Sequence, residues 1–289
     1  MMKSKVYLYI LCFILIATNN SCNKKEKNMN THNQPIYELY IDARGCYFEI
    51  LINDVPVYFH YNIGATSFRL PINNYIPKSG EHSISLRMKS VVLGKSFPKE
   101  TMVSLKIDKY PKGLPRDRKG IFSYKTPIFE EKNNGVFIDT MTFKVIVPYT
   151  LTNWQTGIDL TKENKENLRK EIESFYKEYT LAFKNKNLSK YIELTEIRQT
   201  NTFLSLYYNV EQKKKVESSY LDGIQNSKVK LFPLENYKLV FYGKGRLVGL
   251  QKQKEAPGIF IDNEDEKDTF MEYILFYRKD SKSPLKIIF

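Results

Sequence analysis

The segment 46-CYFEILINDVPVYFHY-61 holds two runs of apolar and aromatic residues on either side of the dipeptide Asn53-Asp54. Both runs are rich in β-branched and aromatic residues, which favour strands. Asn and Asp tolerate the left-handed backbone that a two-residue hairpin turn requires. The segment therefore predicts a β-hairpin that turns at Asn53-Asp54.

The sequence around this hairpin predicts further strands and no helix between residues 35 and 149. The clearest strand is 82–88, where polar and apolar residues alternate with a period of two. Other strands are predicted at 36–41, 68–72, 102–107 and 137–148. Short strands separated by turn signals predict an antiparallel β-sandwich over residues 35–150.

The pattern changes after a predicted linker at residues 151–160. Apolar residues then recur at spacings of three and four, which predicts an amphipathic helix that begins near Thr161. Its apolar face consists of Leu168, Ile172, Phe175, Tyr179 and Phe183. A short second helix is predicted at 188–196 and a third at 202–224.

The remaining residues predict antiparallel strands at 229–232, 237–242, 246–251, 259–262, 269–277 and 285–289. Helices followed by strands give an α+β order. Three helices, the second introduced by NKNLSKYIEL (185–194), and then a curved sheet resemble the nuclear-transport-factor-2-like (cystatin-like) fold. The resemblance implies a cone-like α+β domain over residues 161–289. Because that fold includes enzymes, ligand binders and interaction domains, it does not select a function.

The N-terminus has the features of an export signal. Lys3 and Lys5 precede an apolar run at 6–17, which suits a signal peptide and is too short to span a bilayer. Ser21-Cys22 follows, and this pair resembles the lipobox of bacterial lipoproteins in the looser form found in Bacteroidetes, although Asn19 replaces the usual aliphatic residue. The resemblance implies cleavage after residue 21 and acylation of Cys22.

A polar tether, residues 22–34, follows this cysteine. Two or three acyl chains anchor a protein far more firmly than one. The tether has no acidic cluster of the kind that resembles the surface-export signals of Bacteroidetes lipoproteins. This favours a location at the periplasmic face of the outer membrane. A secretory signal with an incidental cysteine and an N-terminal membrane anchor are the alternatives.

Loss of Lys3 and Lys5 would lower the formal net charge from +13 to +11. The lysines are spread along the chain, which indicates a solvated surface and, for an exported protein, no nucleic-acid partner. Cys46 is then the only free cysteine, so the mature chain can form no internal disulfide and no zinc site of the Cys-Cys type. We expect Cys46 to be a buried structural thiol.

The sequence carries no recognisable catalytic motif, and we predict no cofactor, metal site or catalytic residue. The only histidines are His32, His60 and His82, and no local motif pairs one with Cys46. Glu196 and Asp222 remain candidate bases, although surface or capping positions are favoured for both.

Four further segments have a simple structural interpretation. The acidic stretch 262–268 lacks the glycine of a calcium loop and predicts a solvated hairpin loop. Gly243-Lys244-Gly245 predicts a turn, and Phe203, Tyr207 and Tyr208 predict core or pocket lining. Lys213-Lys214-Lys215 predicts a solvated helix face, with an acidic protein or anionic headgroups as alternative partners.

These observations favour a non-enzymatic, lipid-anchored envelope protein that binds another macromolecule. One form of this hypothesis is an immunity protein against a toxin delivered to the periplasm. The alternative is a small-molecule binder or cryptic enzyme that uses the cavity of the C-terminal domain.

Overall fold

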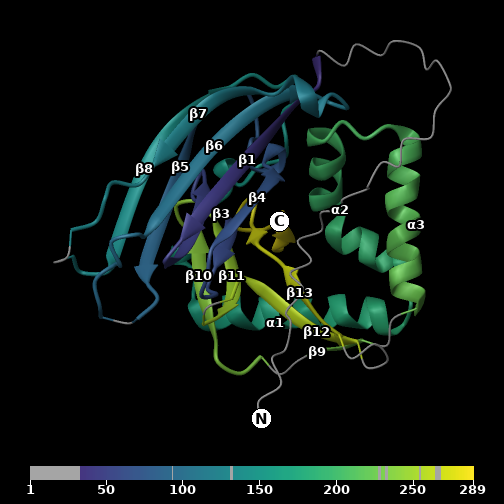
Figure 1. Cartoon of the computed structure of the whole chain (residues 1–289). Coiled ribbons are helices and arrows are strands. Elements are labelled where there is room, and N and C mark those ends of the chain that lie inside the picture. The colour runs from purple at the N-terminus through teal and green to yellow at the C-terminus, as the bar shows by residue number, and fades with distance from the viewer. Residues whose placement is uncertain are drawn as a thin grey trace.

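The computed structural model describes residues 33–92, 94–130, 133–226, 229–231, 234–253, 255–263 and 268–289. The predicted signal peptide, Cys22, His32 and most of the tether lie outside these ranges. Within them, antiparallel sheets and three helices make up a mixed fold (Figure 1).

Eight strands form two four-stranded antiparallel sheets, with the orders β4-β1-β6-β7 and β3-β2-β5-β8. The strands are β1 (Pro35–Arg44), β2 (Cys46–Ile52), β3 (Val55–His60), β4 (Thr66–Pro71), β5 (Gly80–Ser90), β6 (Met102–Pro111), β7 (Lys119–Lys125) and β8 (Val136–Val145). The strands predicted from the sequence are confirmed, although the one predicted at 137–148 ends at Val145. Strand β7 was missed, although its Phe122 and Tyr124 are two positions apart.

The predicted turn of the β2–β3 hairpin is confirmed at Asn53 and Asp54. Both residues have left-handed backbone, with φ of 53° and 60°, and this geometry matches the twist of paired strands. The Asn53 amide nitrogen donates to the carbonyl oxygen of Tyr75 at 2.9 Å and lies 2.9 Å from Nδ1 of His82. The turn is therefore fixed to the segment before β5 and to β5 itself.

Two hydrogen-bond partners fix the orientation of the His82 ring. Its Nε2 donates to the carbonyl oxygen of Lys78 at 2.9 Å, and its Nδ1 accepts from the Asn53 amide. Burial lowers the pKa of His82 and also the pKa of His60 on β3. Protonation of either ring is therefore easier in the unfolded chain.

We expect the protein to lose stability as the pH falls through about 6.5, the pKa of an unperturbed histidine. The unfolded chain then binds protons that the folded chain does not, and this lowers the free energy of unfolding by at most about 1.4 kcal/mol per pH unit for each histidine. Urea unfolding across this range measures the slope. The double variant His60→Gln/His82→Gln should flatten it, and an unchanged slope would contradict the assignment.

Side chains from both sheets meet in one buried cluster. Leu39 of β1, Phe48 of β2, Leu86 of β5 and Leu105 of β6 all belong to it and are almost fully buried. Along β1, β5 and β6 the members of this cluster recur at every second position, so they lie on one face of each of these strands.

Three helices follow, α1 (Lys165–Lys184), α2 (Leu188–Ser205) and α3 (Val210–Asn226). Helix α1 begins after Asn164, whose side chain accepts from the backbone N–H groups of Glu166 and Asn167 at 3.0 Å each. Asn164 is therefore the cap, and the predicted start near Thr161 is too early. Thr161 lies instead in a 3₁₀ turn, Leu160–Lys162.

The predicted limits of the second and third helices are wrong. Helix α2 continues to Ser205, past its predicted end at 196, and α3 begins at Val210 and not at 202. The break falls at Tyr207, which has a left-handed φ of 53°. Lys112 from the β6–β7 loop donates to the Tyr207 carbonyl oxygen and to Gln212, so a distant loop fixes this turn.

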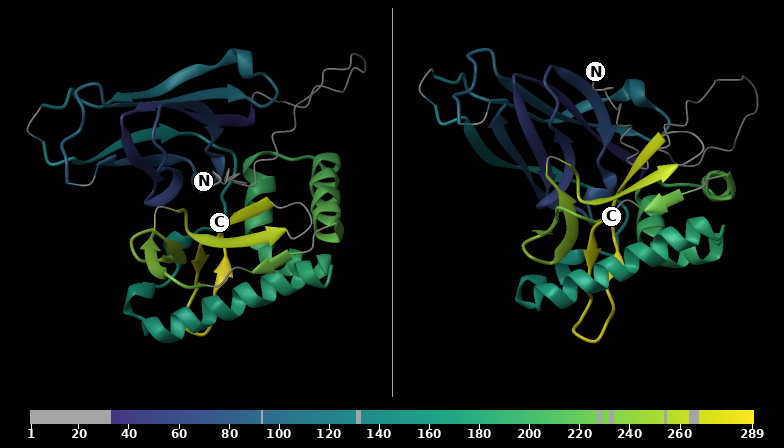
Figure 2. Two further views of the ribbon diagram at one scale, coloured as in Figure 1. Left: turned by 60° about the horizontal axis from the view of Figure 1, so that its bottom comes forward. Right: turned by 90° about the horizontal axis from the view of Figure 1, so that it is seen from below.

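The last strands form two sheets, with the orders β10-β11-β14-β15 and β13-β12-β9 (Figure 2). They are β9 (Val229–Leu231), β10 (Tyr237–Tyr242), β11 (Leu247–Lys252), β12 (Gly258–Asn263), β13 (Asp268–Tyr273), β14 (Phe276–Tyr277) and β15 (Lys286–Ile287). The single strand predicted at 269–277 is wrong, because β13 ends at Tyr273 and β14 belongs to the other sheet.

Polar contacts join the N-terminal sheets to the C-terminal strands. The Asp54 carbonyl oxygen accepts from the backbone N–H of Gly243, and its carboxylate accepts from that of Lys244, both at 2.9 Å. Asn73, in the 3₁₀ turn Asn73–Tyr75, is fully buried and donates to the carbonyl oxygen of Ser205 at the end of α2 at 3.1 Å.

Aromatic rings extend the same junction. The Phe289 ring stacks on Tyr75, with centroids 5.3 Å apart, and meets Trp154 edge-on at 5.2 Å. Trp154 lies in the predicted linker segment and is almost fully buried. The first buried cluster therefore continues from the N-terminal sheets into the C-terminal strands.

Candidate binding face

Cys46 is buried in β2, as expected. Burial alone raises the pKa of its thiol to about 12, so the thiolate form is scarce at neutral pH. Both ring nitrogens of His82 form hydrogen bonds, with Asn53 and with Lys78. His60 stacks on Phe48 with ring centroids 5.1 Å apart. The described geometry assigns no nucleophilic role to Cys46.

We expect native Cys46 to react with a thiol reagent roughly a thousandfold more slowly than the unfolded chain at about pH 8, because its thiolate fraction is smaller by about that factor. A soluble chain of residues 23–289 contains Cys46 as its only cysteine. Stopped-flow labelling with and without denaturant measures the ratio. Comparable rates in the two states would contradict a buried thiol.

The two candidate bases from the C-terminal region lie at the surface. Glu196 is exposed on α2 and Asp222 is exposed on α3. The Gly243-Lys244-Gly245 segment is a hairpin turn between β10 and β11, as predicted, and all three residues have positive φ.

The acidic stretch 262–268 joins β12 to β13, which pair as an antiparallel hairpin, as predicted. Residues 264–267 of this stretch lie outside the described ranges. Among the residues that the structure describes, no group of three His, Cys, Asp or Glu side chains could hold a metal ion.

The lysine run on α3 is exposed. Lys213 lies over the Phe203 ring at 5.8 Å, Phe203 stacks with Tyr208 at 5.7 Å, and Lys112 lies over Tyr208 at 5.5 Å. These rings therefore pack between two lysines. They connect the α2–α3 turn to the β6–β7 loop.

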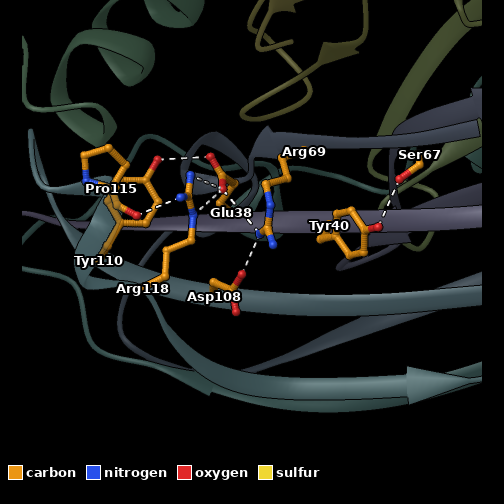
Figure 3. A network of polar contacts seen from close by, with 8 residues as sticks. All are labelled: Glu38, Tyr40, Ser67, Arg69, Asp108, Tyr110, Pro115 and Arg118. Atoms are coloured by element: carbon orange, nitrogen blue, oxygen red, sulfur yellow. Dashed lines mark hydrogen bonds and ion pairs between the residues drawn. The ribbon is translucent and has the colours of Figure 1, made fainter.

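The most organised polar cluster lies on the outer face of the sheet β4-β1-β6-β7 (Figure 3). Glu38 of β1 is its centre and is buried. Its carboxylate accepts from Arg118 Nε at 2.9 Å, from the Tyr110 hydroxyl at 3.1 Å and from Arg69 Nη1 at 3.5 Å. One buried carboxylate thus holds two guanidinium groups and a phenol from three other parts of the chain.

Both arginines also contact aromatic rings. Arg69 lies over Tyr40 at 4.7 Å and bonds Asp108 at 2.5 Å. Arg118 lies over Tyr110 at 4.9 Å. About a third of each arginine side chain stays exposed. We call these six residues, Glu38, Tyr40, Arg69, Asp108, Tyr110 and Arg118, the charged face.

A cavity of about 440 Å³ adjoins the charged face. Tyr110 and Arg118 line it, together with Pro35, Lys109 and Lys119. It is an open hollow at the end of the sheet where β1 begins and β6 ends. The charged face therefore continues into a positively charged recess.

No residue of the charged face was singled out from the sequence. The only local signal is Glu38, a carboxylate in the apolar stretch IYELYI (36–41). Its partners come from β4, β6 and the residue just before β7, and only the strand register brings them together. A single sequence does not contain that register.

The chain matches no protein-family model, no curated protein and no solved structure. Within the described ranges, no helix has the length and apolar character needed to cross a membrane. A functional assignment therefore rests on the geometry of the chain's own residues.

Proposed function

We propose that the chain is a lipid-anchored cell-envelope protein that acts without catalysis, as a binding module for another macromolecule. Cys22 carries the lipid, and the fold lies at the periplasmic face of the outer membrane. The partner is a protein, and a toxin that the chain neutralises as an immunity protein is one such partner.

The charged face carries this proposal. Tyrosine and arginine are the residues that most often anchor protein interfaces. Here Arg69 and Arg118 are held by Glu38 and by stacking on tyrosine rings, while about a third of each side chain faces solvent. A partner therefore meets side chains that are already ordered, so less conformational entropy is lost on binding.

The packing of the C-terminal region favours this function over a small-molecule site. Among the described residues, a second buried cluster packs between α1 and the last strands. Tyr176, Tyr179 and Phe276 are among its largest fully buried side chains. A ligand in that interior would have to displace these rings.

We also propose the finer architecture. The two N-terminal sheets form a β-sandwich, supported by the cluster that both share. The helices and last strands form a nuclear-transport-factor-2-like cone, supported by the second cluster, which contains Leu168 and Ile172 of α1 and Val248 of β11.

Photo-crosslinking in intact cells tests the partner. A photoreactive residue replaces Lys106, which is exposed and lies opposite Tyr40 in the register of the charged face. We expect a discrete protein adduct, lost when Arg69→Ala and Arg118→Ala are added. The control places the same residue at Lys144 on the other sheet. No adduct at Lys106, or equal adducts at both positions, would count against the proposal.

Metabolic labelling with a lipid precursor tests the anchor. Cys22→Ser should abolish labelling and release the chain from the membrane fraction, because acylation needs the thiol. Cys46→Ser, the matched control, should label like the wild type. Persistent labelling of the Cys22→Ser chain would exclude this cysteine as the site of attachment.

A further inference from the structure

The cavity beside the charged face contains unbalanced positive charge. Lys109 and Lys119 line it and are direct partners in the β6–β7 register. Neither forms an ion pair with any described residue. Like charges placed opposite each other in a sheet disfavour the pairing. Glu38 neutralises Arg118. Asp117 is the one carboxylate in the lining of the cavity and faces two lysines there.

The same cavity lies where the predicted tether enters the fold. Pro35, the first residue of β1, lines it. The carbonyl oxygen of Gln34 accepts from the backbone N–H of Lys112 at 2.9 Å, which fixes the end of the tether beside the β6–β7 loop. The 13 residues from Cys22 to Gln34 span at most about 45 Å.

The β6–β7 loop beside this point has an interfacial pattern. Leu114 is 41% exposed and stands between Lys112 and Arg116. An exposed apolar side chain flanked by cations suits the boundary between lipid headgroups and acyl chains. The loop and the cavity share one end of the sheet.

We propose that this cavity binds the phosphate group of an anionic phospholipid in the membrane that holds the anchor. Lys109 and Lys119 are the ion partners of the phosphate, and Leu114 enters the headgroup layer. The negative charge removes the repulsion between the two lysines. The inference rests on the proposed lipid anchor, which brings this end of the fold to the membrane, and it gives the charged face a fixed orientation relative to the bilayer.

Sedimentation with vesicles tests the site without the anchor. The chain of residues 23–289 is mixed with phosphatidylcholine vesicles, either pure or containing phosphatidylglycerol. Each lysine near an anionic surface contributes about a fivefold gain in partition, so Lys109→Gln/Lys119→Gln should bind the anionic vesicles roughly 30-fold more weakly. Lys89→Gln/Lys144→Gln removes the same charge from the other sheet and should change binding little. Thermal unfolding confirms that each chain is folded.

Several outcomes would overturn the proposal. Equal partition of the wild type and the Lys109/Lys119 variant would exclude the site, and equal weakening of the control pair would mean that diffuse charge binds the vesicles. Calorimetric binding of inorganic phosphate that needs both lysines, without vesicle binding, would assign the cavity to a soluble anion. Because this chain carries no lipid, these results are independent of whether Cys22 is acylated.

Discussion

Asn73→Ala should lower the free energy of unfolding by about 3–5 kcal/mol, because it leaves several buried polar groups without partners. The Asn73 side-chain oxygen accepts from the backbone N–H of Tyr37 at 2.8 Å. Its amide donates to the carbonyl oxygens of Pro35 at 2.9 Å and Ser205 at 3.1 Å. Alanine removes these three hydrogen bonds and a longer one to the Tyr149 hydroxyl at 3.4 Å, and the side chain is too deeply buried for water to replace it.

Asn74→Ala is the matched control for this prediction. Asn74 is only half-buried, and its side chain contacts Thr202 and Ser205 of α2. Its loss should cost no more than about 1 kcal/mol. Urea unfolding of both variants measures the difference. Equal destabilisation would mean that Asn73 does not hold the junction in the way its contacts indicate.

Arg198→Leu should cost about 3–5 kcal/mol, the range for removing one partner of a buried ion pair. Arg198 of α2 bonds Glu272 of β13 at 2.6 Å, and the two side chains are 13% and 15% exposed. The same guanidinium reaches the Tyr179 and Tyr191 hydroxyl groups at 3.5 and 3.4 Å. Leucine would leave the Glu272 carboxylate poorly solvated and without this cation.

The double variant Arg198→Leu/Glu272→Leu should recover part of that loss, because the isolated charge is gone. An exposed pair provides the comparison. Lys170 and Glu166 lie 2.7 Å apart on α1 with side chains 69% and 75% exposed, so Lys170→Ala should cost less than about 0.5 kcal/mol. If Arg198→Leu proved equally mild, the ion pair between α2 and β13 would not contribute to the free energy of unfolding.

The local sequence was sufficient to predict those elements whose structure is determined by neighbouring residues. The β2–β3 hairpin follows from two residues, Asn53 and Asp54, that suit the turn by themselves. The periodicity of α1 identified most of its buried face, since Leu168, Ile172 and Tyr179 are buried. Phe175 and Phe183 of the predicted face are only half-buried, and the fully buried Tyr176 was not assigned to it. Its start was misplaced by a few residues because Thr161 and Asn164 are both plausible caps.

The local sequence did not predict features that are determined by contacts with distant residues. Nothing between residues 202 and 209 is a glycine or proline, so the break between α2 and α3 has no strong local signal. Lys112 fixes Tyr207 from another part of the chain. The same limit explains the candidate site, because only the strand register brings Arg69 and Arg118 to the buried carboxylate of Glu38.

The bond between the carboxylate of Asp54 and the backbone of Lys244 joins residues that are 190 positions apart. Bringing such distant residues together costs loop-closure entropy, and contacts of high sequence separation slow folding. The two hairpins that meet there are themselves local structures that can form early. We therefore expect φ-values near zero for Phe289, which stacks on Tyr75 across this junction, and higher values within the β2–β3 hairpin, so that substitutions at Phe289 speed unfolding more than they slow folding.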